Sequence, residues 1–210
     1  MPVLMTFGDS NTHGTPPITD VGVYERFDAA TRWPRLAAAE LQWELVEEGL
    51  PGRTAQFDDP IMGSHMNGQV GLKMALCSQG PIDILTIMLG TNDVKARFCA
   101  PPETVTGGIA SLLDIAQGAD MQTRHSGFQI LLICPPPVVE VGPIKAEFYG
   151  GATKSQSLAA HYAQLAQARG VGFFDAGTVI KVSMVDGVHY DAPSHAVLAQ
   201  AVAGALRAMV

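Results

Sequence analysis

The sequence predicts a three-layer α/β domain built on a five-stranded parallel sheet. Short apolar runs alternate with longer segments of helical periodicity along the whole chain. Several of these runs are apolar at every position, as strands covered on both faces must be. The chain has 210 residues, of which 47% are hydrophobic and 16% charged. This length suits one domain, and the composition excludes disorder and supports a core without disulfides or metals.

The predicted strands are five apolar runs, each bounded by Gly, Pro or polar residues. In chain order they are Val3–Phe7, Leu45–Val46 with its neighbours, Ile82–Leu89, Phe128–Cys134 and Val171–Phe174. Helical patterns stand between them, and parallel strands joined by helices require right-handed crossovers. Helices are therefore expected on both faces of a twisted sheet.

Helical periodicity is clearest in three segments. Trp33–Trp43 carries Pro34 in a first-turn position, where a missing N–H costs nothing. A second helix is expected to stop at Gly170, and an amphipathic helix closes the chain. Their apolar positions are Leu158, Tyr162 and Leu165 in the second helix and Leu198, Val202, Leu206 and Met209 in the last. The one long irregular stretch expected is Pro135–Gly151, and loops of that length are usually functional or lie at an interface.

Composition and missing motifs exclude several function classes. Thirteen Lys and Arg against twenty Asp and Glu give a net charge of −7 with no basic stripe, so no nucleic-acid partner is expected. No window approaches the ~20 apolar residues of a membrane span, and the first residues lack a signal-peptide pattern. A cytoplasmic protein without membrane contact is predicted. Motifs of α/β-hydrolases, P-loop NTPases, dinucleotide-binding folds and zincins are missing.

No metal or cofactor is predicted either. The three cysteines show no C-x-x-C spacing, and four of the histidines have no mutual spacing of ligand type, so structural or surface roles are expected for both sets. These residues are Cys77, Cys99 and Cys134, and His65, His125, His161 and His195.

Polar residues follow the predicted strands where they end. The segments are GDSN at 8–11, PGRT at 51–54, GTND at 90–93 and, before the last helix, DGVH at 186–189. Ligands of open α/β sheets bind outside the carboxyl ends of the strands. The four segments are therefore expected to meet at one edge of the sheet.

Together they contain the groups that acyl transfer needs. A serine hydroxyl becomes a nucleophile when an imidazole takes its proton and a carboxylate orients that imidazole. Ser10, His189 and Asp186 can supply these three groups, with Asp175 as the alternative acid. The oxyanion needs fixed donors, and the candidates are the backbone N–H groups of Ser10 and Gly52 and the side-chain amide of Asn92.

Each segment alone has a structural explanation as a turn or a helix cap. All four segments are expected at the same edge of the sheet, and this joint occurrence favours a catalytic site. Residues next to the triad are predicted to line the substrate pocket. These are Asp9, Asn11, His13 and Val188.

With these segments the chain resembles the SGNH hydrolases, also called the GDSL esterase and lipase family, over nearly its whole length. Phe7–Ser10 looks like the first family block, Gly52 like the second, Gly90–Asp93 like the third and Asp186–His189 like the fifth. The strings EEGL at 47–50, IMLGTND at 87–93, PPP at 135–137 and FFDAG at 173–177 resemble the bacterial arylesterase and acyltransferase branch. The resemblance implies one SGNH hydrolase domain over residues 1–210, a flavodoxin-like fold and ester hydrolysis without a metal. Two positions depart from it: Asn11 replaces the Leu of the GDSL name, and His13 stands where members of that branch carry Trp.

The function expected is a serine esterase for small esters with short acyl groups on aryl or alkyl alcohols, with acyl transfer left open as a second activity. The acyl length is implied by the resemblance. A carbohydrate acetylesterase, a thioesterase or lysophospholipase of the same superfamily, and a catalytically silent flavodoxin-like binding module are the alternatives. A homo-oligomer is also expected, because the charged fraction is low and the resembled branch is oligomeric. Its contact is placed at the Pro135–Gly151 loop, whose apolar residues are expected to be exposed: Val138, Val139, Ile144, Phe148 and Tyr149.

Overall fold

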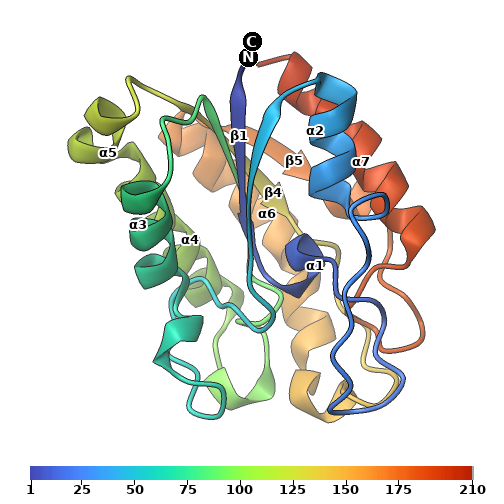
Figure 1. Cartoon of the computed structure of the whole chain (residues 1–210). Helices are drawn as coiled ribbons and strands as arrows, with labels where there is room; N and C mark the ends of the chain where they lie inside the picture. Colours follow the sequence, from blue (N-terminus) through green and yellow to red (C-terminus); the bar gives the residue numbers. More distant parts are fainter. Residues whose placement is uncertain (210) are drawn as a thin grey trace.

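A five-stranded sheet forms the middle layer of the protein, seen here in a computed structural model that describes residues 1–209 (Figure 1). The strand order is β2-β1-β3-β4-β5 and every neighbouring pair is parallel, which confirms the predicted fold class. The strands are β1 (Val3–Gly8), β2 (Glu44–Gly49), β3 (Ile84–Met88), β4 (Gln129–Cys134) and β5 (Gly172–Asp175).

Helices cover both faces of this sheet. In chain order they are α1 (Ser10–His13), α2 (Trp33–Leu41), α3 (Gly68–Ser78), α4 (Pro102–Gln117), α5 (Ala119–Arg124), α6 (Gly151–Arg169) and α7 (Ala192–Arg207). Short 3₁₀ turns lie at η1 (Ser64–Met66), η2 (Ala96–Phe98), η3 (Lys145–Phe148) and η4 (Ala176–Thr178). Figure 1 shows α3, α4 and α5 on one side of the sheet and α2 and α7 on the other.

Alternation along the strands divides the core in two. Met5 and Phe7 of β1 pack toward α3, α4 and α6, whereas Leu4 packs toward α2 and α7. The inner strands β1 and β3 are almost wholly buried, so both of their faces contribute. Burying one such large apolar side chain stabilises the fold by roughly 1.5–3 kcal/mol. These two cores hold the carboxyl ends of the strands in fixed positions.

The predicted helix ends have identifiable causes. Pro34 stands in the first turn of α2, as expected. Gly170 ends α6 in the left-handed conformation, with φ of 63°, and its N–H donates to the carbonyls of Ala166 and Gln167. Asp191 caps α7 by accepting a hydrogen bond from the Ser194 N–H at 2.9 Å.

The Pro135–Gly151 loop differs from its prediction. Val138, Ile144 and Phe148 are buried, with 2%, 9% and 1% of their surface exposed, and only Tyr149 of the expected set is strongly exposed, at 77%. The reason is that the loop folds back onto α6, where the Val138 N–H donates to Ser155 Oγ at 3.0 Å. Val139 packs against the second core. The apolar residues of this loop therefore complete the protein's own core.

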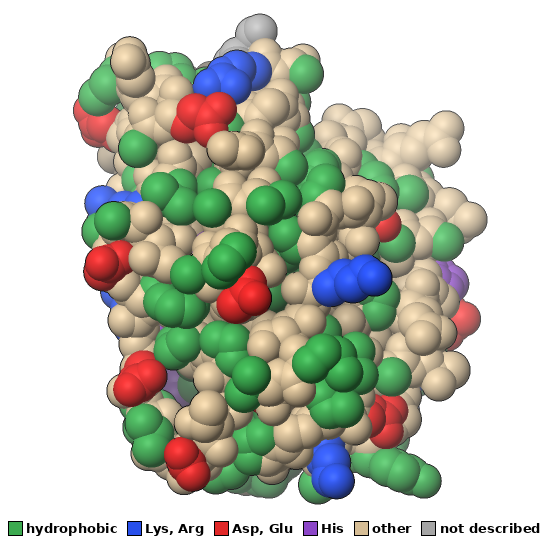
Figure 2. All heavy atoms as spheres, turned by 90° about the vertical axis from the view of Figure 1, so that its right-hand side faces the viewer, with side chains coloured by type: hydrophobic (Ala, Val, Ile, Leu, Met, Phe, Trp, Pro, Cys, Tyr) green, Lys and Arg blue, Asp and Glu red, His purple; other side chains and the backbone are tan. Residues whose placement is uncertain are grey.

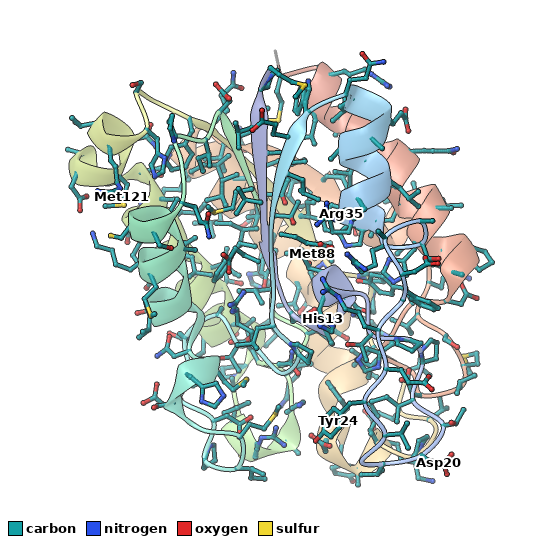
Figure 3. The ribbon with its side chains drawn as sticks, in the orientation of Figure 1. His13, Asp20, Tyr24, Arg35, Met88 and Met121 are labelled. Atoms are coloured by element: carbon teal, nitrogen blue, oxygen red, sulfur yellow. The ribbon has the colours of Figure 1, made fainter. Side chains whose placement is uncertain are left out.

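A second irregular stretch, which the sequence patterns did not reveal, precedes α2. We call residues 15–32 the strap. It leaves α1 after Gly14 and returns at Phe27, whose N–H donates to the Gly14 carbonyl at 2.8 Å. Its tip exposes Val21, Val23 and Tyr24, the last by 93%. Figure 3 places Asp20 and Tyr24 of the strap at the end of the molecule toward which the strands' carboxyl ends point.

The strap is fixed to the edge strand β2 by arginines. Glu47, a partly buried residue of β2, accepts hydrogen bonds from Arg32 Nε at 2.8 Å and from Arg35 Nε at 3.1 Å, and Arg26 lies 3.4 Å away. Arg26 also donates from Nε to the His13 carbonyl at 2.8 Å. One carboxylate thus holds the strap, α1 and α2 together.

The basic side chains on one face of the protein are scattered, as the composition led us to expect. On the face covered by α2 and α7, Figure 2 shows Lys and Arg side chains singly and apart. Among residues 1–209, no helix combines the length and the apolar character needed to cross a membrane.

Candidate active site

Ser10, His189 and Asp186 form one hydrogen-bonded row at the carboxyl end of β1. His189 Nε2 lies 3.0 Å from Ser10 Oγ, and His189 Nδ1 lies 2.6 Å from Asp186 Oδ2. A carboxylate accepts only, so Nδ1 carries the proton and Nε2 is free to accept from the serine hydroxyl. Asp175 caps η4 by accepting from the Gly177 N–H and makes no contact with His189 among the hydrogen bonds of the described chain. The structure thus brings the side chains of Ser10, His189 and Asp186 together, with Asp186 beside His189.

The DGVH segment brings its acid and imidazole together by a tight turn. Asp186 Oδ1 accepts from the N–H groups of Val188 and His189, both at 3.0 Å. Gly187 has φ of 74°, and a Cβ on it would lie 1.8 Å from the Val139 carbonyl oxygen. The Val139 N–H in turn donates to the Gly187 carbonyl at 2.8 Å. A glycine is therefore required at 187 for both its conformation and its contact.

The strap supplies one more donor to the acid. The Ile18 N–H donates to Asp186 Oδ2 at 2.7 Å, the same oxygen that faces His189. Burial alone would raise the pKa of Asp186, but the hydrogen bond and charge of His189 and the Ile18 and His189 N–H groups hold that pKa below its ordinary value. No sequence motif marks a backbone amide in a loop, and the strap's role was missed for that reason.

Ser10 begins α1 two residues after Gly8, the last residue of β1. A Cβ on Gly8 would lie 2.0 Å from Thr12 Oγ1, so only glycine lets the chain turn this sharply. Asp9 is the N-cap of the turn and accepts the Asn11 N–H at 2.9 Å. The backbone thereby presents Ser10 at the edge of the sheet, where 5% of its surface is exposed.

The candidate oxyanion donors lie on the neighbouring loops. Gly52 follows β2 with φ of 89°, and Asn92 follows β3. Asn92 Nδ2 donates to the Arg53 carbonyl at 3.0 Å, which places the amide beside the loop that carries Gly52. Within residues 1–209, the hydrogen bonds of the protein leave the N–H groups of Ser10 and Gly52 without an acceptor. Two backbone donors and one amide are thus available near Ser10.

Arg53 fixes the Gly52 loop to β1, a role that the sequence patterns did not indicate. Its guanidinium stacks 4.1 Å above the ring of Phe7 and donates from Nη1 to the carbonyls of Gly8 and Glu48. Burial lowers the pKa of Arg53 to about 10, which leaves it charged at neutral pH. The loop with Gly52 and the turn with Ser10 are therefore held in one rigid unit.

Two buried carboxyl groups lie behind the donors. Burial raises the pKa of Asp9 to about 6, against the opposing effects of the Asn11 N–H and the charges of His189, Lys95 and Arg53. Burial likewise raises the pKa of Asp93 to about 7, although it accepts from the Ala55 N–H with both oxygens. These groups face the protein interior next to the reacting end of the sheet.

The predicted pocket residues Asp9 and Asn11 lie beside the site with their side chains turned toward the protein. Asn11 Nδ2 donates to the Val188 carbonyl at 3.1 Å, and the backbone carbonyl of Asn11 accepts from Trp33 Nε1. Both Asp9 and Asn11 are 1% exposed. In this arrangement they connect parts of the site, and neither is free to contact a substrate.

The other two predicted pocket residues occupy different environments. Val188 is buried in the larger core. His13 ends α1, is partly exposed and lies 3.2 Å from Thr15 Oγ1 through Nδ1. Burial, followed by the charges of Arg26 and Arg32, lowers the pKa of His13, which favours its neutral form. Figure 3 shows His13 between the sheet and the strap.

Side chains suited to a metal do not gather at this site. Among residues 1–209, no group of three or more His, Cys, Asp or Glu is placed to hold an ion. A cavity of about 340 Å³ lies at the opposite end of the sheet, where Gln129 and Gly172 begin β4 and β5. This cavity is therefore not part of the site that contains Ser10.

Comparison with known proteins agrees with this geometry. A family model described as the GDSL-like lipase/acylhydrolase family matches residues 6–206. The chain belongs to the GDSL-like lipase/acylhydrolase family. No curated protein sequence matches this family member significantly.

Solved structures match this GDSL-family chain over its full length. An aryl esterase from M. smegmatis is 34% identical with a TM-score of 0.93, and a carbohydrate acetylesterase from Sinorhizobium meliloti is 32% identical with a TM-score of 0.94. A putative arylesterase from Agrobacterium tumefaciens is 37% identical with a TM-score of 0.89. In all three comparisons 100% of both chains is covered. The protein is a carboxylic ester hydrolase with the fold of these enzymes.

Proposed function

We propose that this hydrolase is a serine esterase for esters of short acyl groups, with Ser10 as nucleophile, His189 as general base and acid, and Asp186 as the group that orients His189. The observation that carries the proposal is the row of contacts at 3.0 and 2.6 Å, with the Asn92 amide on the adjacent loop. A catalytic triad requires a hydroxyl, an imidazole and a carboxylate hydrogen-bonded in this order.

The reaction proceeds in two halves. Ser10 Oγ attacks the ester carbonyl as its proton passes to His189 Nε2, and the charge of the resulting imidazolium is stabilised by Asp186. The oxyanion is met by the N–H groups of Ser10 and Gly52 and by the Asn92 amide. His189 then gives its proton to the leaving alcohol, and water attacks the acyl-enzyme by the same route in reverse.

Packing around the oxyanion donors supports a short acyl group. An added Cβ on Gly52 would lie 2.5 Å from the end of Met62 and 3.2 Å from the sulfur of Met66, so two side chains pack directly on this loop. Ser10 and His189 are each 5% exposed. An acetyl-like group fits such a confined centre better than the long chains of a lysophospholipase substrate.

The first test removes the nucleophile. Ser10→Ala should abolish ester turnover, by on the order of 10⁴-fold or more, while the melting temperature stays unchanged. The wild-type protein should be labelled covalently by a fluorophosphonate and Ser10→Ala should not. A variant that retains a tenth of the activity would contradict the assignment, as would an unlabelled wild type.

A second test identifies the alcohol part of the ester substrate. The structural neighbours suggest two classes of alcohol. We propose aryl or simple alkyl esters first, supported by the likeness to aryl esterases, and acetylated carbohydrates second, supported by the likeness to a carbohydrate acetylesterase. A panel of acetyl, butyryl and octanoyl esters and thioesters on aryl, alkyl and sugar groups separates them. Higher kcat/KM for octanoyl than for acetyl esters would refute the short-acyl proposal.

Acyl transfer and self-association complete the proposal. Exposed apolar residues occur in four loops at the carboxyl end of the sheet, at Tyr24, Met62, Tyr149 and Val185, and such surfaces are typical of interfaces. We propose a homo-oligomer whose subunit contact includes these exposed residues. The contact would shield the acyl-enzyme from water, so that an added alcohol can compete with water for the acyl group. Light scattering that gives the chain mass of 22.2 kDa would exclude the oligomer. Hydrolysis alone, from a vinyl ester in excess primary alcohol, would exclude the transfer.

A further inference from the structure

Asp9 precedes the nucleophile in the chain, and its two oxygens contact different parts of the site: the turn that carries Ser10 and the oxyanion donor Asn92. Its Oδ1 accepts the Asn11 N–H at 2.9 Å and so caps the turn that begins with Ser10. Its Oδ2 lies 3.4 Å from Asn92 Nδ2. Asp9 itself is 1% exposed, so the carboxyl group is enclosed between these two partners.

The Asn92 amide is surrounded by acceptors on its nitrogen side. Nδ2 donates to the Arg53 carbonyl at 3.0 Å and faces Asp9 Oδ2 with its other hydrogen. A flip of the amide would bring its oxygen against two oxygen atoms, which is unfavourable. The two acceptors together therefore keep the NH₂ group of Asn92, and not its carbonyl, on the side where the oxyanion forms.

The two contacts differ in length, and the difference suits catalysis. The bond to the Arg53 carbonyl has an ordinary length, whereas 3.4 Å is at the long limit for a hydrogen bond. The second hydrogen of Asn92 is thus oriented but weakly engaged. A small rotation of the amide brings this hydrogen to the oxyanion in the transition state, and giving up so long a contact with Asp9 costs little.

From this geometry we infer that Asp9 is a positioning residue for the reaction, one that orients the Asn92 amide toward the oxyanion while it caps the Ser10 turn. The inference rests on the proposed function, in which Asn92 is an oxyanion donor. Asp9 touches no reacting atom, and its effect passes through Asn92.

Asp9→Asn separates the two contacts. An asparagine oxygen can still cap the Asn11 N–H, since Asn is as good an N-cap as Asp, but its NH₂ group then faces the NH₂ group of Asn92. The variant should lower kcat by roughly 10- to 100-fold, leave KM within about twofold and keep its melting temperature close to wild type. Asp191→Asn, which makes the same exchange at the N-cap of α7, is the matched control and should leave kcat unchanged.

A double-mutant cycle shows whether the effect passes through Asn92. Asn92→Ala alone should lower kcat by roughly 10²-fold or more, and adding Asp9→Asn to it should lower kcat by less than about threefold. Full additivity would overturn the inference, because Asp9 would then act independently of Asn92. Wild-type kcat in Asp9→Asn would overturn it as well.

Two further variants keep the test decisive. If Asp9→Asn does not fold, Asp9→Ser retains an N-capping oxygen but is too short to reach Asn92, and it should show the same kcat loss and the same cycle. Ser10→Ala in the same assay reports on the proposed function: turnover without Ser10 refutes that function whatever Asp9 does. Inactive Ser10→Ala and impaired Asn92→Ala beside a fully active Asp9 variant refute the inference alone.

Discussion

The loop of residues 135–150 and the strap of residues 15–32 both reach the turn that carries Asp186, but they are held in different ways. The first buries most of its apolar side chains and contacts the turn through the hydrogen bond from the Val139 N–H to the Gly187 carbonyl and through the close approach of the Val139 oxygen to Gly187. The strap exposes its apolar tip, is held at its base by Glu47, and contacts the turn through the single N–H of Ile18. We infer that the first loop fixes the conformation of the turn that carries Asp186 and that the strap lowers the pKa of Asp186.

The largest effect is expected from the core of the first loop. Phe148→Ala should lower the free energy of unfolding by about 3–5 kcal/mol, because it removes a side chain that is 1% exposed and leaves a cavity. Tyr24→Ala, an aromatic truncation at the strap tip, should change it by less than about 0.5 kcal/mol. Urea denaturation of both variants measures the contrast. Equal losses would show that the strap tip is packed as tightly as the loop.

Next comes the contact between the first loop and the triad turn. Gly187→Ala should lower kcat/KM by roughly 10²-fold or more, since a Cβ there lies 1.8 Å from the Val139 oxygen and must displace Asp186 or His189. Gly22→Ala in the strap has a similar φ of 92° but open space around it. It should retain wild-type activity and cost no more than about 1–2 kcal/mol of stability. Comparable kinetics in the two variants would contradict a rigid triad turn.

A smaller, pH-dependent effect is expected from the strap. Ile18→Pro removes the N–H that faces Asp186 Oδ2, so the pKa of Asp186, now held low, should rise. The active enzyme needs this carboxylate ionised, and activity should therefore be lost at a higher pH than in wild type as the solution is acidified. At pH 8 kcat should fall by only about 5- to 20-fold.

Ile18→Val is the control for this change, because it keeps the N–H and trims one methylene. Its pH profile should coincide with that of wild type. A profile of Ile18→Pro that is merely scaled down, without movement of the acid limb, would mean that the strap supports folding but not the ionisation of Asp186.

The smallest effect concerns the exposed tip itself. Val21→Ser together with Tyr24→Ser should leave the unfolding free energy of the isolated chain within about 0.5 kcal/mol, since neither residue contributes to the two cores. Light scattering should show weaker association if the tip lies in a subunit contact. An unchanged mass would move the proposed contact to other exposed residues of this end.

Sequence patterns predicted the fold and the four site segments because both depend on local signals. Buried strands appear as apolar runs, and turns at strand ends need glycine at particular places, as at Gly8 and Gly52. The preference for Asp186 over Asp175 also followed from spacing, since three residues suffice for a tight turn to His189. Patterns failed for the 135–150 loop, where Phe148 has the same apolar character whether it faces solvent or the core.

The sequence by itself determined which residue types stand at the carboxyl ends of the parallel strands, and with them the family and the chemistry. Tertiary structure alone decided how those residues are supported. The Ile18 N–H, the Arg53 guanidinium and the carboxylate of Asp9 act through contacts between residues 45 to 168 positions apart. Such contacts leave no periodicity or spacing in the chain, because hydrogen bonds between distant segments depend on positions that only the packed layers fix.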